Sequence, residues 1–319
     1  MCTAIAYSGQ DFYFGRNLDF EHSFSEKIVV TARDFPLSFR HTDKIFSHYA
    51  IIGMGIVSNN FPLYFDAANE NGLSVAGLLF PHFSVYHPPK EGKLNIASFE
   101  FIPYILSICG SVAEARELLS GINITNTQFS DEFPPSPLHF IIADKDGCIV
   151  AESTAEGLMV YDNPVGVLTN APPFPSQMHN LRNFINLSPR EPESDFPHYS
   201  RGLGSVGLPG DFSSQSRFVK ASFLKQNSPK YENEQECISQ FFHILDSVLM
   251  VRGSVFTENE DMEISHYSSC INASRGIYYY KTYDNLSPSA VRLSDYDLDR
   301  DMLYTFDLVR SFGVNYQRL

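Results

Sequence analysis

The first twenty residues constrain the fold more than any other stretch of this chain. Two apolar runs flank a polar turn that contains Gly9, and this pattern predicts a β-hairpin. The hairpin would bring Arg16, Asn17 and Asp19 close to Cys2. If the turn is centred near Gly9, the residue opposite Cys2 is Arg16 or Asn17, and a shift of one residue would exchange the two faces. Either register gathers a thiol, a guanidinium and a carboxylate at one end of the hairpin.

The position of Cys2 also has a chemical consequence. Removal of the initiator Met would leave Cys2 at the N-terminus, with its α-amine beside its own sulfur. An α-amine has a pKa of about 7.7–8.0, so it can serve as a base near pH 7. A nucleophile activated by an N-terminal amine needs no His. In the alternative interpretation, Cys2 is a small apolar residue at the start of a buried strand, and Arg16 and Asp19 form only a surface ion pair.

Further strands are predicted from apolar and β-branched runs. An Asn-Gly pair at 71–72 predicts a second hairpin between the runs 63–66 and 73–80. Short apolar runs separated by turn signals indicate an antiparallel meander between residues 138 and 169. Other strands are predicted at 27–33, around 271, and at 276–280, 291–293 and 304–306.

Helices are predicted between these groups of strands. Ser111 and Glu114 have the spacing of a capping box, which predicts a helix that ends near Gly121. Apolar residues at spacings of three and four predict a helix over 232–250. Shorter helices are predicted over 98–109 and 177–185, and loops over 123–137 and 188–214. This order, without a repeat or a linker, predicts one α+β domain over residues 1–319 with Met1 removed.

Charge and cysteine usage exclude several classes of protein. The 319 residues carry 23 Lys and Arg against 37 Asp and Glu, a formal charge of −14 that disfavours nucleic acid and anionic membranes as partners. The five cysteines are scattered without a CxxC pair, which argues against a disulfide framework and a zinc site. No leader or membrane-length apolar run is evident, so we expect a cytoplasmic protein without metal or cofactor.

Two motifs fail on their context. Residues 202–207 match GxGxxG, but they follow a polar loop and precede Pro209, so the strand and helix of a dinucleotide site are missing. The acidic stretch 292–301 lacks the glycine and the terminal Glu of a calcium loop. We interpret both as connections.

Five separated stretches together resemble the choloylglycine hydrolases, a family that contains bile salt hydrolases and penicillin V acylases. The resemblance covers residues 1 to about 220 in order and spacing, and the tail is compatible with it. It implies an α+β N-terminal nucleophile hydrolase fold, a four-layer αββα sandwich with two stacked antiparallel sheets between helical layers. The stretches are Met1–Thr3, Phe14–Asp19, Asn69–Leu73 with Ala76–Leu78, Pro164–Asn170, and Gly207–Asp211 with Ser214–Phe218.

The resemblance implies amide hydrolysis through an acyl-enzyme. By position Cys2 is similar to the family's nucleophile, and its own α-amine would return the proton to the leaving amine. Asn170 would donate to the oxyanion, a role worth about 2.7–4 kcal/mol for one donor. Arg16 and Arg217 would lower the thiol pKa, and Asp19 would orient the amine.

Asn170 and Arg217 could instead have purely structural roles. Asn170 could merely cap a turn, and Arg217 could pair only with Asp211. The chain also departs from the family at Leu79, where bile salt hydrolases typically have Asn and penicillin V acylases often Tyr. The family's oxyanion contact there comes from the backbone N–H, which Leu79 retains, but a side-chain contact is lost.

Substrate-binding residues follow from the size of a steroid acyl group. An apolar trough is expected, and each of its candidates could equally be a core residue. Arg201, in a segment that resembles the one facing the amino-acid portion, could pair with a carboxylate or, better, a sulfonate, which favours taurine conjugates; as a surface residue it would do neither. The trough candidates are Leu18, Phe20, Phe61, Phe65 and the loop 129–138.

The expected function is therefore that of a bile salt hydrolase, which releases glycine or taurine from conjugated bile acids. The alternative enzyme is a penicillin V acylase or another N-acyl amide acylase. This alternative stands because Leu79 departs from the residue that bile salt hydrolases typically have there. A catalytically silent protein that binds bile acids or lipids is the alternative from another class. The family resemblance also implies a homotetramer.

Overall fold

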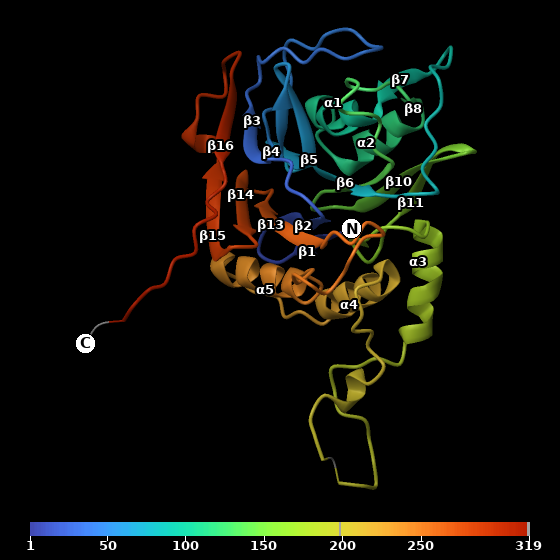
Figure 1. The fold of residues 1–319 in the computed structure, drawn as a ribbon, viewed down its shortest axis with the longest axis vertical. Coiled ribbons are helices and arrows are strands. Elements are labelled where there is room, and N and C mark those ends of the chain that lie inside the picture. Colours follow the sequence, from blue (N-terminus) through green and yellow to red (C-terminus); the bar gives the residue numbers. More distant parts are fainter. Residues whose placement is uncertain (198, 318–319) are drawn as a thin grey trace.

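The computed structural model of this chain describes residues 1–197 and 199–317. Within them, two antiparallel sheets lie face to face (Figure 1). The six-stranded sheet contains, in spatial order, β12 (Val167–Leu168), β1 (Cys2–Ser8), β2 (Phe12–Phe20), β13 (Ile264–Asn272), β14 (Ile277–Thr282) and β15 (Asn285–Arg292). The eight-stranded sheet contains β11 (Gly157–Asp162), β10 (Cys148–Thr154), β9 (Leu138–Ala143), β6 (Ser74–Leu79), β5 (Phe61–Asn69), β4 (Ile51–Ser58), β3 (Lys27–Thr31) and β16 (Leu303–Asp307).

Helices cover the two outer faces of the sheets. On the eight-stranded sheet lie α1 (Phe101–Ile108) and α2 (Val112–Leu119), beside the parallel pair β7 (Leu94–Ala97) and β8 (Ile122–Thr125). On the six-stranded sheet lie α4 (Ser214–Gln226) and α5 (Glu234–Asp246), with α3 (Phe174–Leu181) beside α4 (Figure 1). Short 3₁₀ turns span Ser98–Glu100, Arg182–Phe184, Leu203–Ser205 and Leu293–Asp295. The layers therefore run helix, sheet, sheet, helix, as the resemblance implies.

The space between the sheets is filled by apolar side chains from both. Ala4 and Phe14 of the six-stranded sheet share one buried cluster with Ile52 and Ile141 of the eight-stranded sheet. A second cluster lies under α1, where the rings of Phe101 and Phe140 stack at 4.0 Å. Burial of this kind stabilises a fold by about 25 cal/mol per Å² of apolar surface, which makes the stacked sheets a firm frame for the end of β1.

The opening hairpin is confirmed, but its register differs from both expected ones. Cys2 lies opposite Leu18, because the connection contains three residues centred on Gln10 rather than on Gly9. In this register the side chains of Cys2 and Arg16 point to the same face, since residues opposite each other share a face and alternate along a strand. Arg16 reaches the eight-stranded sheet.

The opposite face of the hairpin carries Thr3, Asn17 and Asp19 and looks toward the helices. The side-chain amide of Asn17 donates to the carbonyl of Leu245 in α5 at 2.9 Å. The hairpin therefore separates the thiol and Arg16 from Asp19 by the thickness of the sheet, except at its open end near Met1.

Several other elements differ from the expected ones. The helix α4 was not predicted, and β4 was missed because Gly53 and Gly55 interrupt a strand whose inner half is buried on both faces. β8 occupies the start of the loop expected over 123–137. Within the loop expected over 188–214, position 198 lies outside the described residues. The expected helix over 232–250 is shorter at both ends: it begins after Asn233, whose side chain accepts the N–H of Glu236, and α5 ends at Asp246.

Candidate active site

The thiol of Cys2 lies buried at the first position of β1. Its side chain is 2% exposed, and the Nη2 group of Arg16 donates a hydrogen bond to Sγ. The backbone N–H of Cys2 donates to Oδ1 of Asn170 at 2.7 Å. The carbonyl of Cys2 accepts from Nη1 of Arg217 at 2.5 Å. Three of the residues that the sequence singles out therefore contact Cys2 directly.

Arg16 is a buried cation beside the thiol. Its Nη1 group donates to the carbonyls of Gly77 at 2.5 Å and Phe65 at 3.3 Å, so strands of the facing sheet fix its position. Burial by itself would lower the pKa of Arg16, but the charges of Cys2 and Asp66 act against it and raise that pKa above its ordinary value. A permanent positive charge next to a thiol favours the thiolate.

Asp66 is a buried carboxylate behind Arg16 that the sequence analysis missed. It accepts hydrogen bonds from the hydroxyls of Tyr267 at 2.5 Å, Tyr278 at 2.6 Å and Ser269 at 2.9 Å. Burial raises the pKa of Asp66, while the charge of Arg16 and the three hydroxyl donors oppose the increase. An acidic residue inside the apolar run of β5 was the available signal, because a buried carboxylate needs partners.

Arg217 lies in the first turn of α4 and is buried. Its Nη1 group also donates to Oγ1 of Thr3 at 2.6 Å, and its Nη2 group donates to Oδ1 of Asn170 at 2.8 Å. Burial lowers the pKa of Arg217, and the charges of Asp19 and Cys2 act in the opposite direction.

The alternative in which Arg217 pairs only with Asp211 is therefore wrong. Asp211 instead accepts from Ser213 and Ser216 at the start of the same helix.

Asn170 follows β12, and its side chain contacts Cys2, Arg217 and Leu79. Both groups that contact its Oδ1 atom are donors, Cys2 N–H and Arg217 Nη2, so the orientation of the amide is fixed. Its Nδ2 group donates to the carbonyl of Leu79 at 2.8 Å. Leu79 is half-buried at the end of β6, so its backbone lies next to the amide of Asn170.

Asp19 is buried on the helix-facing side of the hairpin. Its Oδ1 atom accepts from the hydroxyl of Ser265, and within the described residues its Oδ2 atom has no hydrogen-bond partner. The amino group of Met1 donates to the carbonyl of Asp19 at 2.6 Å and forms an ion pair with Glu263. With Met1 attached, the nitrogen of Cys2 is a peptide nitrogen rather than an amine.

Some of the expected substrate-binding residues lie near this site. Leu18 shares the face of Cys2. Phe20 and Phe65 both pack on Phe24, at 4.9 and 5.4 Å between ring centroids, and the carbonyl of Phe65 contacts Arg16. These residues form an apolar group beside the guanidinium.

Two other expected substrate-binding residues, Phe61 and Arg201, do not belong to this apolar group beside Arg16. Phe61 belongs to a separate buried cluster with Phe99 and Phe129, at 5.9 and 6.3 Å. Arg201 is exposed in the segment between α3 and α4, which projects from the body of the molecule (Figure 1). The position of Arg201 therefore supports no preference between taurine and glycine conjugates.

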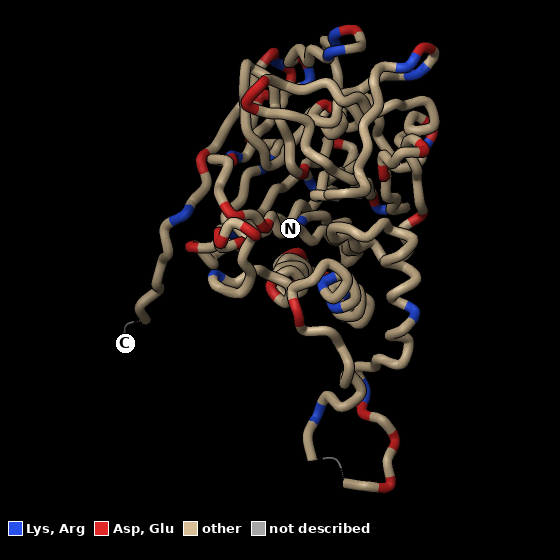
Figure 2. Tube along the Cα trace, turned by 45° about the vertical axis from the view of Figure 1, so that its right-hand side comes forward, with Lys and Arg blue, Asp and Glu red and all other residues tan. Residues whose placement is uncertain are grey.

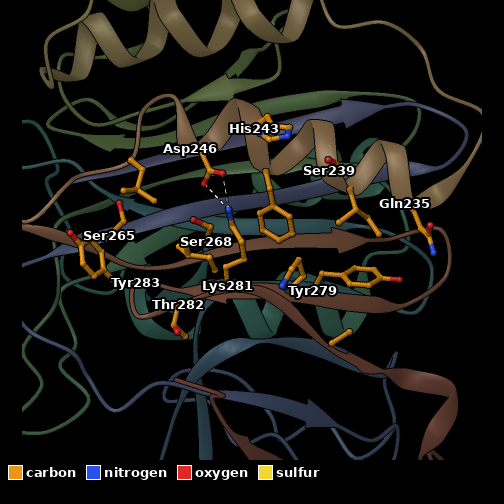
Figure 3. A pocket seen from close by; sticks show the side chains of 16 residues that line it. Gln235, Ser239, His243, Asp246, Ser265, Ser268, Tyr279, Lys281, Thr282 and Tyr283 are labelled. Atoms are coloured by element: carbon orange, nitrogen blue, oxygen red, sulfur yellow. Dashed lines mark hydrogen bonds and ion pairs between the residues drawn. The ribbon is translucent and has the colours of Figure 1, made fainter. Parts of the chain in front are cut away.

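A groove of about 830 Å³ lies elsewhere. It opens between α5 and the strands β14 and β15, where Lys281 binds Asp246 at 2.7 and 2.8 Å and lies over the ring of Phe242 (Figure 3). This is the helix-covered face of the six-stranded sheet, whereas the thiol of Cys2 points to the other face. We therefore do not assign the reaction to this groove.

Within the described residues we looked for a cluster of metal ligands and for a membrane-spanning helix. Among the described residues, no group of three or more His, Cys, Asp or Glu side chains is placed to hold a metal ion. In the same part of the chain, every helix is too short or too polar to cross a membrane. Acidic residues are spread over the outer loops (Figure 2).

Two stacked antiparallel sheets between helices, with a buried thiol at the start of a central strand, define the class of N-terminal nucleophile hydrolases. The family model described as linear amide C–N hydrolases, choloylglycine hydrolase family, matches residues 2–306. The chain belongs to this family, as the resemblance in the sequence predicts.

Relatives of known activity match almost the whole chain. A bile salt hydrolase/transferase of Lactiplantibacillus plantarum is 45% identical over 97% of this chain and 97% of the relative. One of Clostridium perfringens is 37% identical over 99% of both chains. The solved structure of a conjugated bile acid hydrolase from Clostridium perfringens superposes with a TM-score of 0.93 at 35% identity, over 99% of this chain and 100% of the other.

A penicillin V acylase from Agrobacterium tumefaciens has the same fold. It superposes with a TM-score of 0.79 at 20% identity, over 97% of this chain and 92% of the other. At that identity the match concerns the fold alone.

Proposed function

We propose that this enzyme hydrolyses the amide bond of bile acids conjugated to glycine or taurine. The observation that carries the proposal is the set of contacts around Cys2, where Arg16 touches the thiol and Asn170 joins the Cys2 nitrogen to Arg217. The high identity to bile salt hydrolases over nearly the full chain supports this substrate class. The alternative penicillin V acylase has support only from a shared fold.

The proposed mechanism begins with removal of Met1. The Cys2 nitrogen then becomes an α-amine that keeps its donor position at Asn170, and the open Oδ2 atom of Asp19 supplies a nearby acceptor. Burial lowers the pKa of the Met1 amino group in the present chain. An α-amine has an ordinary pKa of about 7.7–8.0, so a Cys2 amine would be partly neutral near pH 7 and could act as the base. Intact-mass measurement should find the chain without Met1, and retained Met1 would contradict this mechanism.

In the acylation step, the Cys2 amine takes the thiol proton and Sγ attacks the substrate carbonyl. The C–S bond forms, and the carbonyl oxygen becomes an oxyanion. As the intermediate collapses, the C–N bond breaks and the amine returns the proton to the departing glycine or taurine nitrogen. Arg16 stabilises the thiolate throughout by its fixed positive charge.

In the deacylation step, the free Cys2 amine takes a proton from water, and the oxygen attacks the thioester. The C–O bond forms, the C–S bond breaks, and the proton returns to the sulfur as the bile acid leaves. In both steps the oxyanion would accept from Nδ2 of Asn170 and from the backbone N–H of Leu79. The contact of the Asn170 amide with Leu79 supports this pairing of donors.

We propose that three apolar residues beside Arg16 form one wall of the site for the steroid acyl group. These residues are Leu18, Phe20 and Phe65. Phe61 lies in a different cluster and is better explained as a core residue. The expected preference for taurine gains no support from Arg201, which is exposed in the segment between α3 and α4, so we propose no preference between the two conjugates.

Initial rates on taurocholate, glycocholate and penicillin V test the substrate class. We expect rapid release of taurine or glycine and slow cleavage of penicillin V. Rapid penicillin cleavage beside negligible bile salt turnover would replace the first proposal by the alternative. Tight bile acid binding without turnover of any amide would instead favour the silent binding protein.

Acyl transfer is a second candidate activity. The relatives from Lactiplantibacillus plantarum and Clostridium perfringens carry the words hydrolase/transferase in their names. An amine could intercept the proposed thioester in place of water. Adding a second amino acid to a taurocholate reaction should yield a new conjugate, whereas free bile acid as the sole product would exclude transfer.

We further propose one domain over residues 1–319 after loss of Met1, a cytoplasmic location and a homotetramer. The shared cluster between the sheets supports a single domain. The five free cysteines suit a reducing compartment. Exposed apolar side chains such as Ile185, Phe196 and Phe312 suit contacts between copies, and light scattering would determine the mass.

A further inference from the structure

A buried pair of charged residues lies under the proposed oxyanion site. His139 in β9 and Glu152 in β10 are directly opposite each other, and both are fully buried. Nδ1 of His139 lies 3.1 Å from Oε1 of Glu152. Their neighbours Ile141 and Val150 belong to the cluster between the sheets, so the pair faces the six-stranded sheet. The mechanism above makes no use of it.

The imidazole of His139 contacts the neighbours of both proposed oxyanion donors. Its Nε2 atom lies 2.8 Å from the carbonyl of Thr169, the residue before Asn170. A carbonyl can only accept, so Nε2 carries a proton and donates. The ring stacks on Phe80, the residue after Leu79, at 4.3 Å and an interplanar angle of 6°. One ring therefore links the chain segments that carry the two donors.

Glu152 holds the ring in this orientation. Its Oε1 atom also accepts the backbone N–H of Phe174 at 2.9 Å, at the start of α3. One proton lies between Oε1 and Nδ1 whether the pair is neutral or ionic, so the pair has no net charge. The arrangement therefore keeps Nε2–H directed at Thr169.

Asn170 has other supports, but they hold different atoms. The hydroxyl of Ser214 accepts its backbone N–H at 2.9 Å, and Gln177 donates to its carbonyl at 3.2 Å. These bonds fix the peptide of Asn170 and do not connect it to Leu79. The bond from Nδ2 of Asn170 to the carbonyl of Leu79 joins the two segments through the side chain of Asn170 itself. The contacts of His139 join them through the neighbouring residues Thr169 and Phe80.

We propose that His139 is a positioning residue that sets the spacing between the Asn170 amide and the backbone N–H of Leu79, with Glu152 fixing its orientation. This inference rests on the proposed function, because it assumes that Asn170 and Leu79 hold the oxyanion. A group that acts on an oxyanion site affects the transition state more than the bound substrate.

Two substitutions separate this role from simple packing. In His139→Gln the amide nitrogen can occupy the place of Nε2 and donate to Thr169. In His139→Asn it reaches only the place of Nδ1, beside Glu152. Both variants lose the aromatic ring and keep a buried amide. They therefore differ in the contact with Thr169.

We expect His139→Asn to lower kcat on taurocholate by on the order of 10- to 100-fold, because the oxyanion donor Asn170 is displaced rather than removed. KM should change by less than about 3-fold. His139→Gln should retain kcat within about 5-fold of the parent enzyme. His48→Asn is the matched control, because His48 is also buried between two carbonyls, of Tyr49 and Phe35, at 2.7 and 2.8 Å. It should lower the melting temperature without lowering kcat.

Equal kcat values in the Gln and Asn variants, or a loss confined to KM, would overturn the inference. Asn170→Ala, measured beside them, separates this failure from that of the proposed function. A parent enzyme that does not cleave taurocholate, or an Asn170→Ala variant with full kcat, refutes the proposed function and the inference together. An active parent and a slow Asn170→Ala variant, with equal His139 variants, refute the inference alone.

Discussion

Two buried polar networks meet at Cys2, and they are built differently. The nucleophile side consists of Arg16 and Asp66 with the hydroxyls of Tyr267, Ser269 and Tyr278, all on the inner faces of strands. The oxyanion side comes mostly from the ends of elements, with Gln177 from the middle of α3. It consists of Asn170, Arg217, Ser214, Gln177 and His139.

The difference lies in what each network supplies. The nucleophile side supplies charge, since a cation touches the thiol and a carboxylate balances it inside the core. The oxyanion side supplies geometry, since its bonds fix the position of one amide. Substitutions on the nucleophile side should therefore affect stability as well as rate. Those on the oxyanion side should act mainly on kcat.

The largest expected effect falls where the two networks join. Cys2→Ala removes the nucleophile, and we expect the rate of taurocholate hydrolysis to fall by about 10⁴-fold or more, as loss of a nucleophile does elsewhere. Released taurine is the measurement. Cys148→Ala, in β10, is the matched control and should keep the parent rate. Turnover by the Cys2→Ala variant at more than a few per cent would remove the thiol from the mechanism.

The next effect tests the oxyanion side alone. Asn170→Ala should lower kcat by about 10²- to 10³-fold with little change in KM, because one oxyanion donor is lost. Steady-state kinetics on taurocholate give both constants. Asn163→Ala offers a control, since the side chain of Asn163 is also buried but binds backbone groups away from Cys2: it donates to the carbonyl of Val167 at 3.0 Å and accepts the N–H of Gly166 at 2.8 Å. If both variants lost kcat equally, the amide of Asn170 would have no special role.

The third effect tests the nucleophile side through stability. Asp66→Asn removes the buried charge that faces Arg16, so the free energy of unfolding should fall by about 3–5 kcal/mol. Urea denaturation of both proteins measures it. Asp307→Asn breaks an ion pair with Lys27 in which both side chains are exposed, and it should cost less than about 1 kcal/mol because solvent screens the pair. Equal losses would mean that the location of Asp66 is unimportant.

The two sides also differ in how much of them the sequence predicts. Cys2, Arg16 and Asp19 lie on one hairpin, so a turn signal and strand alternation suffice to bring them together, although the three-residue connection shifts the register. Asn170 and Arg217 are separated from Cys2 by most of the chain, and only the resemblance to a family pointed to them.

Other parts of the site left weaker signals. Asp66 and His139 each stand alone within an apolar run, and Glu152 follows one. Such single polar residues do not reveal which of them will pair. The sequence did not predict the helix α4, because its buried face includes Arg217 where an amphipathic helix usually has an apolar residue. A buried charge in a strand or helix is therefore the feature to follow, since it requires a partner from a distant segment.

The smallest expected effect concerns the start of α4, which carries Arg217. Hydrogen bonds from Ser213 and Ser216 lower the pKa of Asp211 to about 2. Because the folded-state pKa lies below the ordinary value of 3.8, Asp211 stabilises the fold above pH 3.8 and loses this contribution as pH falls toward 2. Asp211→Asn should therefore lower stability at pH 7 by less than about 1 kcal/mol, since the group is exposed and screened. Urea midpoints of the two proteins should converge as the pH falls from about 4 toward 2, and Ser216→Ala should behave like Asp211→Asn. A difference between the midpoints that does not depend on pH would mean that Asp211 stabilises the fold by packing rather than by its charge. The contacts with Thr3 and Cys2 would then be what holds Arg217 in place.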